Sequence, residues 1–218
     1  MDTLKTVPAK VDQILEALSK TRAIAILRKC PQPALKNVVS VLEQAGFRLV
    51  EITLDSTRAF GAIAEISSGF PNLIVGAGTV HEVDQVKHSK KSGGRFIVAP
   101  CVSQRVIEAS LQNGLGVFPG GATASEIYGA MAFGATAVKV FPAQQLGGPG
   151  FIKAIMSPLL NPRLVPTGGV DIDNAAGYIE SGAIAVGVGS AVIQSNLIES
   201  GNFLSLERAL KKFMKSVL

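Results

Sequence analysis

The chain alternates short apolar runs with amphipathic segments along almost all of its 218 residues. The runs are rich in Val and Ile and apolar on both faces, which is typical of parallel strands buried under helices. Eight runs occur, at 23–27, 49–54, 73–78, 95–100, 115–120, 136–142, 163–169 and 183–189. This repeat of eight β–α units predicts an α/β fold of the (β/α)8 TIM-barrel type, with an open doubly wound sheet as the alternative.

The segments between the runs carry helix-end signals. Glycine ends four of them, at positions 46, 114, 134 and 182, where it can adopt the left-handed C-cap conformation at least cost. Thr123 and Glu126 have the spacing of a capping box, and Asp171 precedes another amphipathic segment as a helix start. These signals place a helix between successive strands, as the barrel requires.

Both ends of the chain also have helical patterns. Residues 11–20 precede the first apolar run, and we expect them to form an extra helix that caps the bottom of the barrel. The tail, 206–218, has apolar residues at helical spacing and is interpreted as a final helix packed on the barrel. Because there is no linker or low-complexity run, residues 1–218 are predicted to form a single (β/α)8 barrel domain.

Composition excludes several classes of protein. The chain has no uncharged apolar stretch of membrane-spanning length and no apolar signal-peptide core in its first ten residues. Its two cysteines, Cys30 and Cys101, lie far apart, which fits the reducing cytoplasm. The net charge of +5 is compatible with nucleic acid, but the absence of Trp and the presence of only two Tyr leave few stacking platforms. An anionic small-molecule substrate explains the charge as well.

No metal or dinucleotide cofactor is expected. The only histidines, His81 and His88, are not surrounded by a cluster of ligand-type residues, and they are interpreted as solvated surface groups. No glycine-rich dinucleotide loop follows the first apolar run.

Lys139 lies in the middle of the apolar run 136–142, where a lysine is unusual. Alternation along a strand puts it on the same face as Ala137 and Phe141, opposite Val138 and Val140. The two valines suit the layer between strand and helix, so Lys139 is predicted to face the barrel interior. Burial there favours the neutral amine, which can attack a carbonyl carbon to form a Schiff base. The alternative is a lysine at a solvated strand rim.

Glu51 is a second ionisable residue at an inward position, in the run 49–54. A carboxylate near a lysine can act as a proton shuttle. The alternative is a structural Lys–Glu pair, but a buried pair of this kind contributes little to stability because desolvation offsets much of the attraction. Two strands that each place a charge inside the barrel therefore favour a catalytic role.

Glycine-rich sequences end the last two runs, "PTGGV" at 166–170 and "GVGSA" at 187–191. In many barrels the loops after strands seven and eight bind phosphate through backbone N–H groups and a helix N-terminus. Gly168 and Gly169 permit close backbone approach, whereas Gly189 and Ser190 are expected to open the last helix. The pattern indicates a phosphorylated ligand, and plain turn glycines are the alternative.

Other polar or rigid residues follow strands at the same end: Arg28, Thr79, Pro100 and Thr123. Arg28 could bind a substrate carboxylate through two parallel hydrogen bonds. It could equally be a surface cation.

These residues, in this order, resemble the 2-keto-3-deoxy-6-phosphogluconate (KDPG) and 4-hydroxy-2-oxoglutarate (KHG) aldolases. The motifs that carry the resemblance are "VEITL", "VGAGTV", "IVAP", "PGGATASE", "VKVFPA", "PTGGV" and "GVGSA". It implies a cofactor-free class I aldolase, usually a homotrimer, with Lys139 as the Schiff-base lysine and Glu51 as the proton shuttle. It also implies a phosphate site at Gly168, Gly169 and Ser190, and a pyruvate end lined by Thr79, Pro100 and Phe141.

One position departs from the family pattern. Typical KDPG enzymes have an arginine four residues after the glutamate as a carboxylate clamp, and this chain has Asp55 there. The stretch "AILR" resembles the sister 6-phosphogalactonate (KDPGal) aldolases, which implies that Arg28 takes the clamp role, with Arg58 as the rival. Two other functions remain possible from sequence: a sugar-phosphate epimerase or isomerase, and a non-catalytic phosphosugar-binding barrel.

Overall fold

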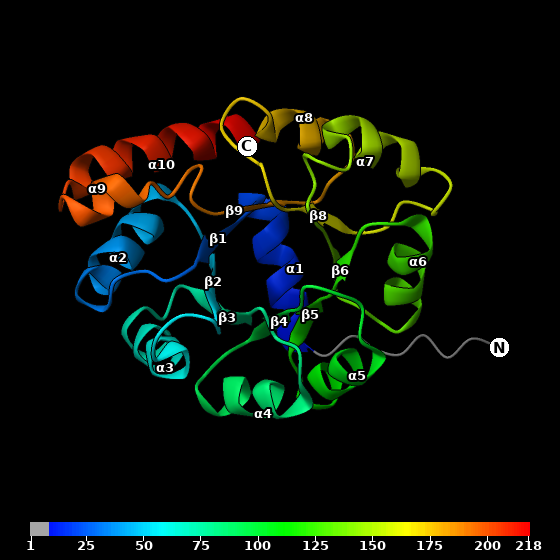
Figure 1. Cartoon of the computed structure of the whole chain (residues 1–218), viewed down its shortest axis with the longest axis horizontal. Coiled ribbons are helices and arrows are strands. Elements are labelled where there is room, and N and C mark those ends of the chain that lie inside the picture. Colours follow the sequence, from blue (N-terminus) through cyan, green and yellow to red (C-terminus); the bar gives the residue numbers. More distant parts are fainter. Residues whose placement is uncertain (1–8) are drawn as a thin grey trace.

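The structure, a computed structural model, describes residues 9–218. Residues 1–8 lie outside the described part. The start of the predicted domain and most of the segment judged to lack a signal-peptide core therefore also lie outside it. Figure 1 shows strands around the centre of the molecule, helices on the outside, and α1 across the middle of the view. In the described residues, no helix is long and apolar enough to cross a membrane.

The strands are β1 (Ala23–Leu27), β2 (Leu49–Thr53), β3 (Ile74–Gly78), β4 (Phe96–Val98), β5 (Gly116–Phe118), β6 (Gly120–Gly121), β7 (Val138–Val140), β8 (Leu164–Pro166) and β9 (Val186–Val188). The helices are α1 (Ala9–Thr21), the short 3-10 helix η1 (Gln32–Ala34), α2 (Leu35–Ala45), α3 (Ala59–Gly69), α4 (Val83–Lys91), α5 (Gln104–Gln112), α6 (Ala124–Ala132), α7 (Gly148–Met156), α8 (Ala175–Glu180), α9 (Ser195–Glu199) and α10 (Phe203–Val217).

Parallel strands form two adjoining sheets. The larger has the order β5-β4-β3-β2-β1-β9 and the smaller the order β6-β7-β8, and all the recorded pairings are parallel. The predicted α/β fold of parallel strands alternating with helices is therefore confirmed.

The fifth predicted strand is interrupted. Pro119 separates β5 from β6, because proline has no N–H to contribute to a ladder. Its carbonyl still accepts the Lys139 N–H at 2.9 Å, so the chain passes from one sheet directly into the other. At the opposite edges a parallel bridge joins Thr167, just after β8, with Gly187 of β9.

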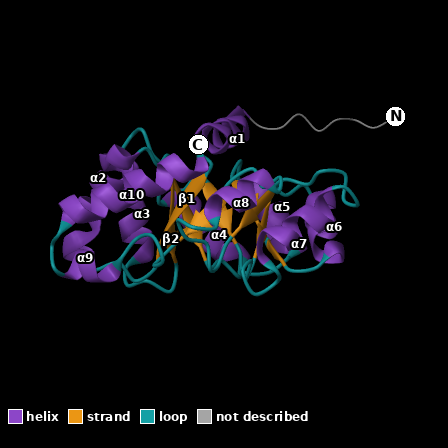
Figure 2. Ribbon diagram, turned by 90° about the horizontal axis from the view of Figure 1, so that it is seen from above, coloured by secondary structure: helices purple, strands orange, loops and turns teal. Residues whose placement is uncertain are grey.

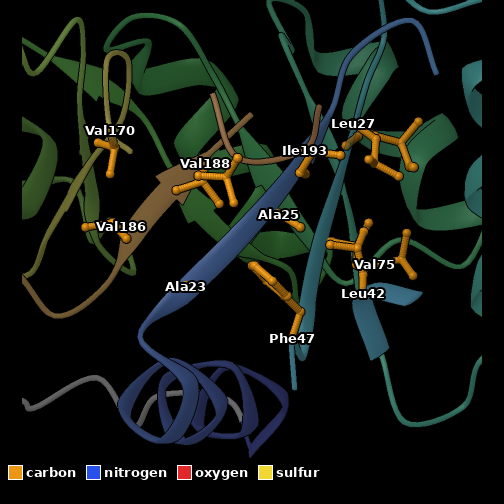
Figure 3. Packing of buried hydrophobic residues seen from close by; sticks show 14 of the residues in the cluster. Ala23, Ala25, Leu27, Leu42, Phe47, Val75, Val170, Val186, Val188 and Ile193 are labelled. Atoms are coloured by element: carbon orange, nitrogen blue, oxygen red, sulfur yellow. The ribbon is translucent and has the colours of Figure 1, made fainter. Parts of the chain in front are cut away.

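The strands bury two separate apolar clusters. The outer cluster lies between the strands and the helices, and Figure 3 shows Ala23, Leu27, Phe47, Val75 and Val188 in it. The inner cluster lies inside the curve of the strands, where Ile14 and Leu18 of α1 pack on strand residues. Its strand members are Ile24, Leu49, Phe96, Val98, Phe118, Ala137, Val165 and Ala185.

Helix α1 matches the predicted extra helix and its expected position. It covers the interior at the N-terminal ends of the strands, and Figure 2 shows it standing apart from the layer of outer helices. Ile14 and Leu18 are completely buried. Full burial of such a side chain contributes about 1.5–3 kcal/mol. The core therefore seals one end of the interior and leaves the other end for polar groups.

The predicted helix ends are largely confirmed. All four glycines have positive φ; that of Gly46, the C-cap of α2, is 104°. Thr123 and Glu126 form the capping box at the start of α6. This also explains why Thr123 does not line the pocket described below, since its hydroxyl is used at the helix end.

Two expected helix starts are wrong. Gly189 and Ser190 do not open a helix: the Gly189 carbonyl accepts the N–H groups of Val192 and Ile193 in a turn, and α9 begins only at Ser195. Asp171 does not directly cap α8. Its carboxylate accepts from the N–H groups of Asp173 and Asn174 in a preceding turn, and α8 begins at Ala175.

Candidate active site

A pocket of about 540 Å³ opens at the C-terminal ends of the strands. It is lined by all eight predicted substrate-binding residues and by Lys139; the eight are Arg28, Thr79, Pro100, Phe141, Gly168, Gly169, Gly189 and Ser190. Glu51 is not part of its wall. It lines a smaller adjoining cavity of about 10 Å³, which shares Ile26, Lys139, Thr167 and Gly187 with the larger pocket.

Lys139 is the central residue of β7, and only 8% of it is exposed. Ala137 belongs to the inner cluster and Val138 and Val140 to the outer one, so Lys139 faces inward as strand alternation predicts. Its Nζ lies 4.9 Å from the centroid of the Phe141 ring. Phe141 can therefore stabilise a cation at Nζ through its π face.

Glu51 lies on β2 and is 2% exposed. Its Oε1 is buried and has no hydrogen-bond partner in the described part of the chain. Desolvation raises the pKa of Glu51 above its ordinary value, the nearby charges of Lys139 and then Arg28 partly oppose this, and Asp55 adds to it. A buried carboxyl with a raised pKa and a free oxygen is suited to donate and accept protons.

Gly78 makes room for this carboxylate. A Cβ at this position of β3 would lie 1.8 Å from Glu51 Oε1, far inside contact distance. A residue with a side chain would therefore displace Glu51. Sequence analysis found Thr79 next to it but assigned nothing to Gly78, because only the neighbouring strand reveals the need for glycine.

Arg28 follows β1 and is fixed by two neighbours. Its Nη1 forms an ion pair with Asp55 Oδ2 at 2.5 Å, and its Nη2 donates to the Thr79 hydroxyl at 3.2 Å. The rival cation Arg58 is the N-cap residue of α3 and does not line the pocket. The structure thus places Arg28, and not Arg58, in the pocket that Lys139 lines.

The loop after β8 is braced from behind. Gly168 and Gly169 have φ of 91° and 75°. The Gln144 N–H donates to the Gly168 carbonyl at 3.1 Å, and Asn174 Nδ2 donates to the Gly169 carbonyl at 2.7 Å. A Cβ at Gly169 would lie 2.4 Å from that of Gln144. The loop is therefore held in one conformation on the same pocket wall as Ser190.

Thr167 and Cys30 are among the pocket residues that sequence reasoning missed. Thr167 lines both cavities and is buried, and its inward position follows from alternation with Val165, which the inner cluster contains. Cys30 is a pocket thiol whose burial raises its pKa to about 11, so it stays protonated at neutral pH and is a poor nucleophile.

The residues present offer no cluster for a metal ion. In the part of the chain that the structure describes, no group of three or more His, Cys, Asp and Glu side chains could hold one. His81 and His88 are both exposed, and His88 packs against the Phe60 ring at 5.6 Å.

Comparison with known proteins identifies the family of the chain. The family model described as KDPG and KHG aldolase matches residues 14–209. A 2-dehydro-3-deoxy-phosphogluconate aldolase from Treponema pallidum (strain Nichols) is 34% identical over 190 residues, which cover 87% of this chain and 90% of the relative.

Solved structures show the same likeness. One described as native KDPGal superposes with a TM-score of 0.82 at 32% identity and covers 89% of this chain and 93% of that one. A chain from a cube-shaped protein cage, designed by fusing symmetric oligomeric domains, gives a TM-score of 0.83 at 32% identity over 90% of this chain and 72% of its own. The protein described here belongs to the KDPG and KHG aldolase family.

Proposed function

We propose that the protein is a class I aldolase, a lyase that cleaves a 2-keto-3-deoxy-6-phospho sugar acid to pyruvate and glyceraldehyde 3-phosphate. KDPG is the proposed main substrate, and 4-hydroxy-2-oxoglutarate, cleaved to pyruvate and glyoxylate, is a second one. The observation that carries the proposal is the placement of Lys139 and Glu51, two buried ionisable side chains, beneath a pocket with glycine loops on its wall. Membership of the family supports it.

Lys139 is the proposed nucleophile. Its neutral amine attacks C2 of the substrate, and the carbinolamine hydroxyl leaves as water after it takes a proton from Glu51. The resulting iminium is a cation close to the Phe141 ring, which stabilises it. The iminium accepts the electron pair of the C3–C4 bond when that bond breaks.

Glu51 is the proposed proton shuttle. Once ionised, it accepts the proton of the C4 hydroxyl as the C3–C4 bond breaks and the aldehyde forms. The enamine that remains is protonated at C3, and water then releases pyruvate from Lys139. The small cavity beside Glu51 has about the volume of one water molecule, so a water can relay these protons between Glu51 and the substrate.

The remaining pocket residues hold the substrate. Arg28 binds its carboxylate, and Thr79 and Pro100 line the pyruvate end. Gly168, Gly169, Gly189 and Ser190 form the phosphate site in the same pocket, where backbone N–H groups and a hydroxyl are suited to an anion.

We also propose that residues 1–218 form one closed (β/α)8 barrel domain. The Thr167–Gly187 bridge and the passage through Pro119 support closure, since they link the two sheets at both edges. The protein is proposed to act as a cytoplasmic homotrimer without a cofactor. The exposed Tyr128 and Phe133 side chains at α6 and the likeness to a symmetric oligomeric domain support assembly.

Pyruvate release from the candidate substrates tests this function. Purified protein is incubated with KDPG, its C4 epimer or 4-hydroxy-2-oxoglutarate, and pyruvate is measured with lactate dehydrogenase and NADH. We expect stoichiometric pyruvate from KDPG, undiminished by EDTA. An epimerase or isomerase would convert a sugar phosphate without releasing pyruvate, and a binding protein would retain the substrate without turnover.

A further inference from the structure

Three consecutive loops meet at the guanidinium of Arg28. It follows β1, its partner Asp55 follows β2, and the hydroxyl that accepts its second N–H belongs to Thr79, directly after β3. Thr79 has a φ of 60°, which is costly for a β-branched residue. This strained conformation places the Thr79 hydroxyl within reach of Arg28.

The loop that carries Asp55 is tied to the loop that carries Arg28. The Lys29 N–H donates to the Ser56 hydroxyl at 2.8 Å, and Gln32 Nε2 donates to the Thr57 carbonyl at 3.2 Å. Asp55 therefore sits on backbone that is already fixed relative to Arg28. Asp55 can therefore fix the direction of the Arg28 guanidinium.

These contacts leave donors for a ligand. A guanidinium has five N–H groups in a rigid fork, and Asp55 and Thr79 engage two of them, so three remain for a substrate carboxylate. Asp55 does not line the pocket, so it holds Arg28 from behind while Arg28 reaches the ligand.

Asp55 is charged where it contacts Arg28. Burial raises the pKa of Asp55, but hydrogen bonds from Thr53 and Arg28 and the charge of Arg28 hold it below its usual value, so Asp55 is ionised at neutral pH. The contact between Asp55 Oδ2 and Arg28 Nη1 is therefore a charge-assisted hydrogen bond, which fixes the direction of the guanidinium.

We propose that Asp55 is a positioning residue that, with Thr79, orients Arg28 toward the substrate carboxylate. This inference rests on the proposed aldolase function. It also explains the departure from the family pattern at position 55. The carboxylate-binding cation is Arg28, after β1, and the position where the family's arginine is expected holds Asp55, which orients Arg28.

Trapping with pyruvate and borohydride measures the orienting role. The pyruvate concentration that gives half-maximal labelling of Lys139 reports affinity, and it can be compared in wild type, Asp55→Ala and Asp55→Asn. We expect Asp55→Ala to raise this concentration about tenfold, because that is roughly the loss of affinity expected when one hydrogen bond to a charged group is removed. Asp55→Asn keeps an acceptor oxygen and should recover most of the affinity. Asp84→Asn removes an exposed carboxylate paired with Lys87 on α4 and serves as the matched control, with no expected change.

The Arg28→Ala background decides whether Asp55 acts through Arg28. There the Asp55 carboxylate has lost its partner and repels the incoming pyruvate, so adding Asp55→Ala should leave binding unchanged or strengthen it. An equal tenfold loss in both backgrounds, or no loss in the wild-type background, would overturn the orienting role.

If wild type itself forms no adduct with pyruvate, the aldolase function fails, and that result is distinct from either outcome for Asp55.

Discussion

The two ends of the strand interior are built from opposite chemistry. At the N-terminal ends, Ile14 and Leu18 of α1 close a wholly apolar cluster. Toward the C-terminal ends, the polar side chains of Glu51, Lys139 and Thr167 line a small cavity beside this cluster. Figure 2 shows α1 on one side of the strands and their loops extending on the other. The apolar end stabilises the fold, whereas the polar end buries ionisable groups at a cost in stability, which the proposed catalytic role explains.

Two glycines of β3 show the same contrast on one strand. A Cβ at Gly76 would lie 2.4 Å from the Phe96 ring, and a Cβ at Gly78 would lie 1.8 Å from the Glu51 carboxylate. One glycine makes room for apolar packing and the other for a functional acid. The absence of a side chain therefore permits apolar packing at Gly76 and a buried carboxyl group at Gly78.

Replacing Lys139 should have the largest effect on activity. Lys139→Met keeps an unbranched buried side chain but cannot form an imine, so we expect kcat to fall at least about 10⁴-fold. The double variant Lys139→Met/Glu51→Gln removes both buried charges and should unfold at a higher temperature than wild type. A double variant that is both inactive and less stable would mean that the pair supports the fold.

Glu51→Gln should lower kcat by about 10²–10⁴-fold, the usual contribution of a general acid–base group. Near-wild-type turnover would make Glu51 only a structural partner of Lys139. The change should also raise stability in a pH-dependent way, because burial raises the pKa of Glu51 in the folded protein.

The sign of that dependence follows from proton linkage. The folded protein binds the Glu51 proton more tightly than the unfolded chain does. The contribution of this proton to the free energy of unfolding is therefore fully present below the pKa that Glu51 has in the unfolded chain, and it is lost as pH rises through the pKa that Glu51 has in the folded protein. Glu51→Gln abolishes this loss. The variant should therefore unfold at a higher temperature than wild type at neutral and alkaline pH, and at a similar temperature in acid.

Ile14→Ala tests the apolar end. It leaves a cavity in the inner cluster, and we expect the free energy of unfolding to fall by about 2–5 kcal/mol. In the folded fraction kcat should stay within about twofold of wild type, because no inner-cluster residue of α1 lines the pocket. Denaturant titration and kinetics at low temperature check both. A selective loss of kcat would show that the two ends are coupled.

Ser190→Ala should have the smallest effect. It removes one hydroxyl from the proposed phosphate site, so KM for KDPG should rise by the equivalent of about 1.5–3 kcal/mol. Cleavage of 4-hydroxy-2-oxoglutarate, which has no phosphate, should not change. Equal losses on the two substrates would place the phosphate elsewhere, and Ser195→Ala, which removes another hydroxyl from the pocket lining, is the matched control.

The pattern of strands and helices was readable from the sequence because it depends on local periodicity. Alternation alone put Lys139 and Glu51 inside, and the placement of α1 followed from its position before the first strand. The turn at Gly189, where a helix start was predicted, could not be read in this way. A Gly-Ser pair suits a turn as well as a helix N-terminus, and the contacts of Val192 and Ile193 decide between them.

The pairing of Arg28 with Asp55 was also beyond the sequence. Asp55 was noticed because an arginine was missing there, but its partner lies 27 residues earlier in another loop. The same holds for Gly78 and Thr167, whose importance depends on what the adjacent strand presents. Strand order and register, which no local pattern contains, create these relations.

The most direct test of the account is the site of the Schiff base. The protein is incubated with pyruvate and borohydride, digested, and mapped by mass spectrometry, with Glu51→Gln as a variant that slows but does not move the reaction. We predict one reduced pyruvyl group, on Lys139. A label on another lysine, or no label at all, would contradict it.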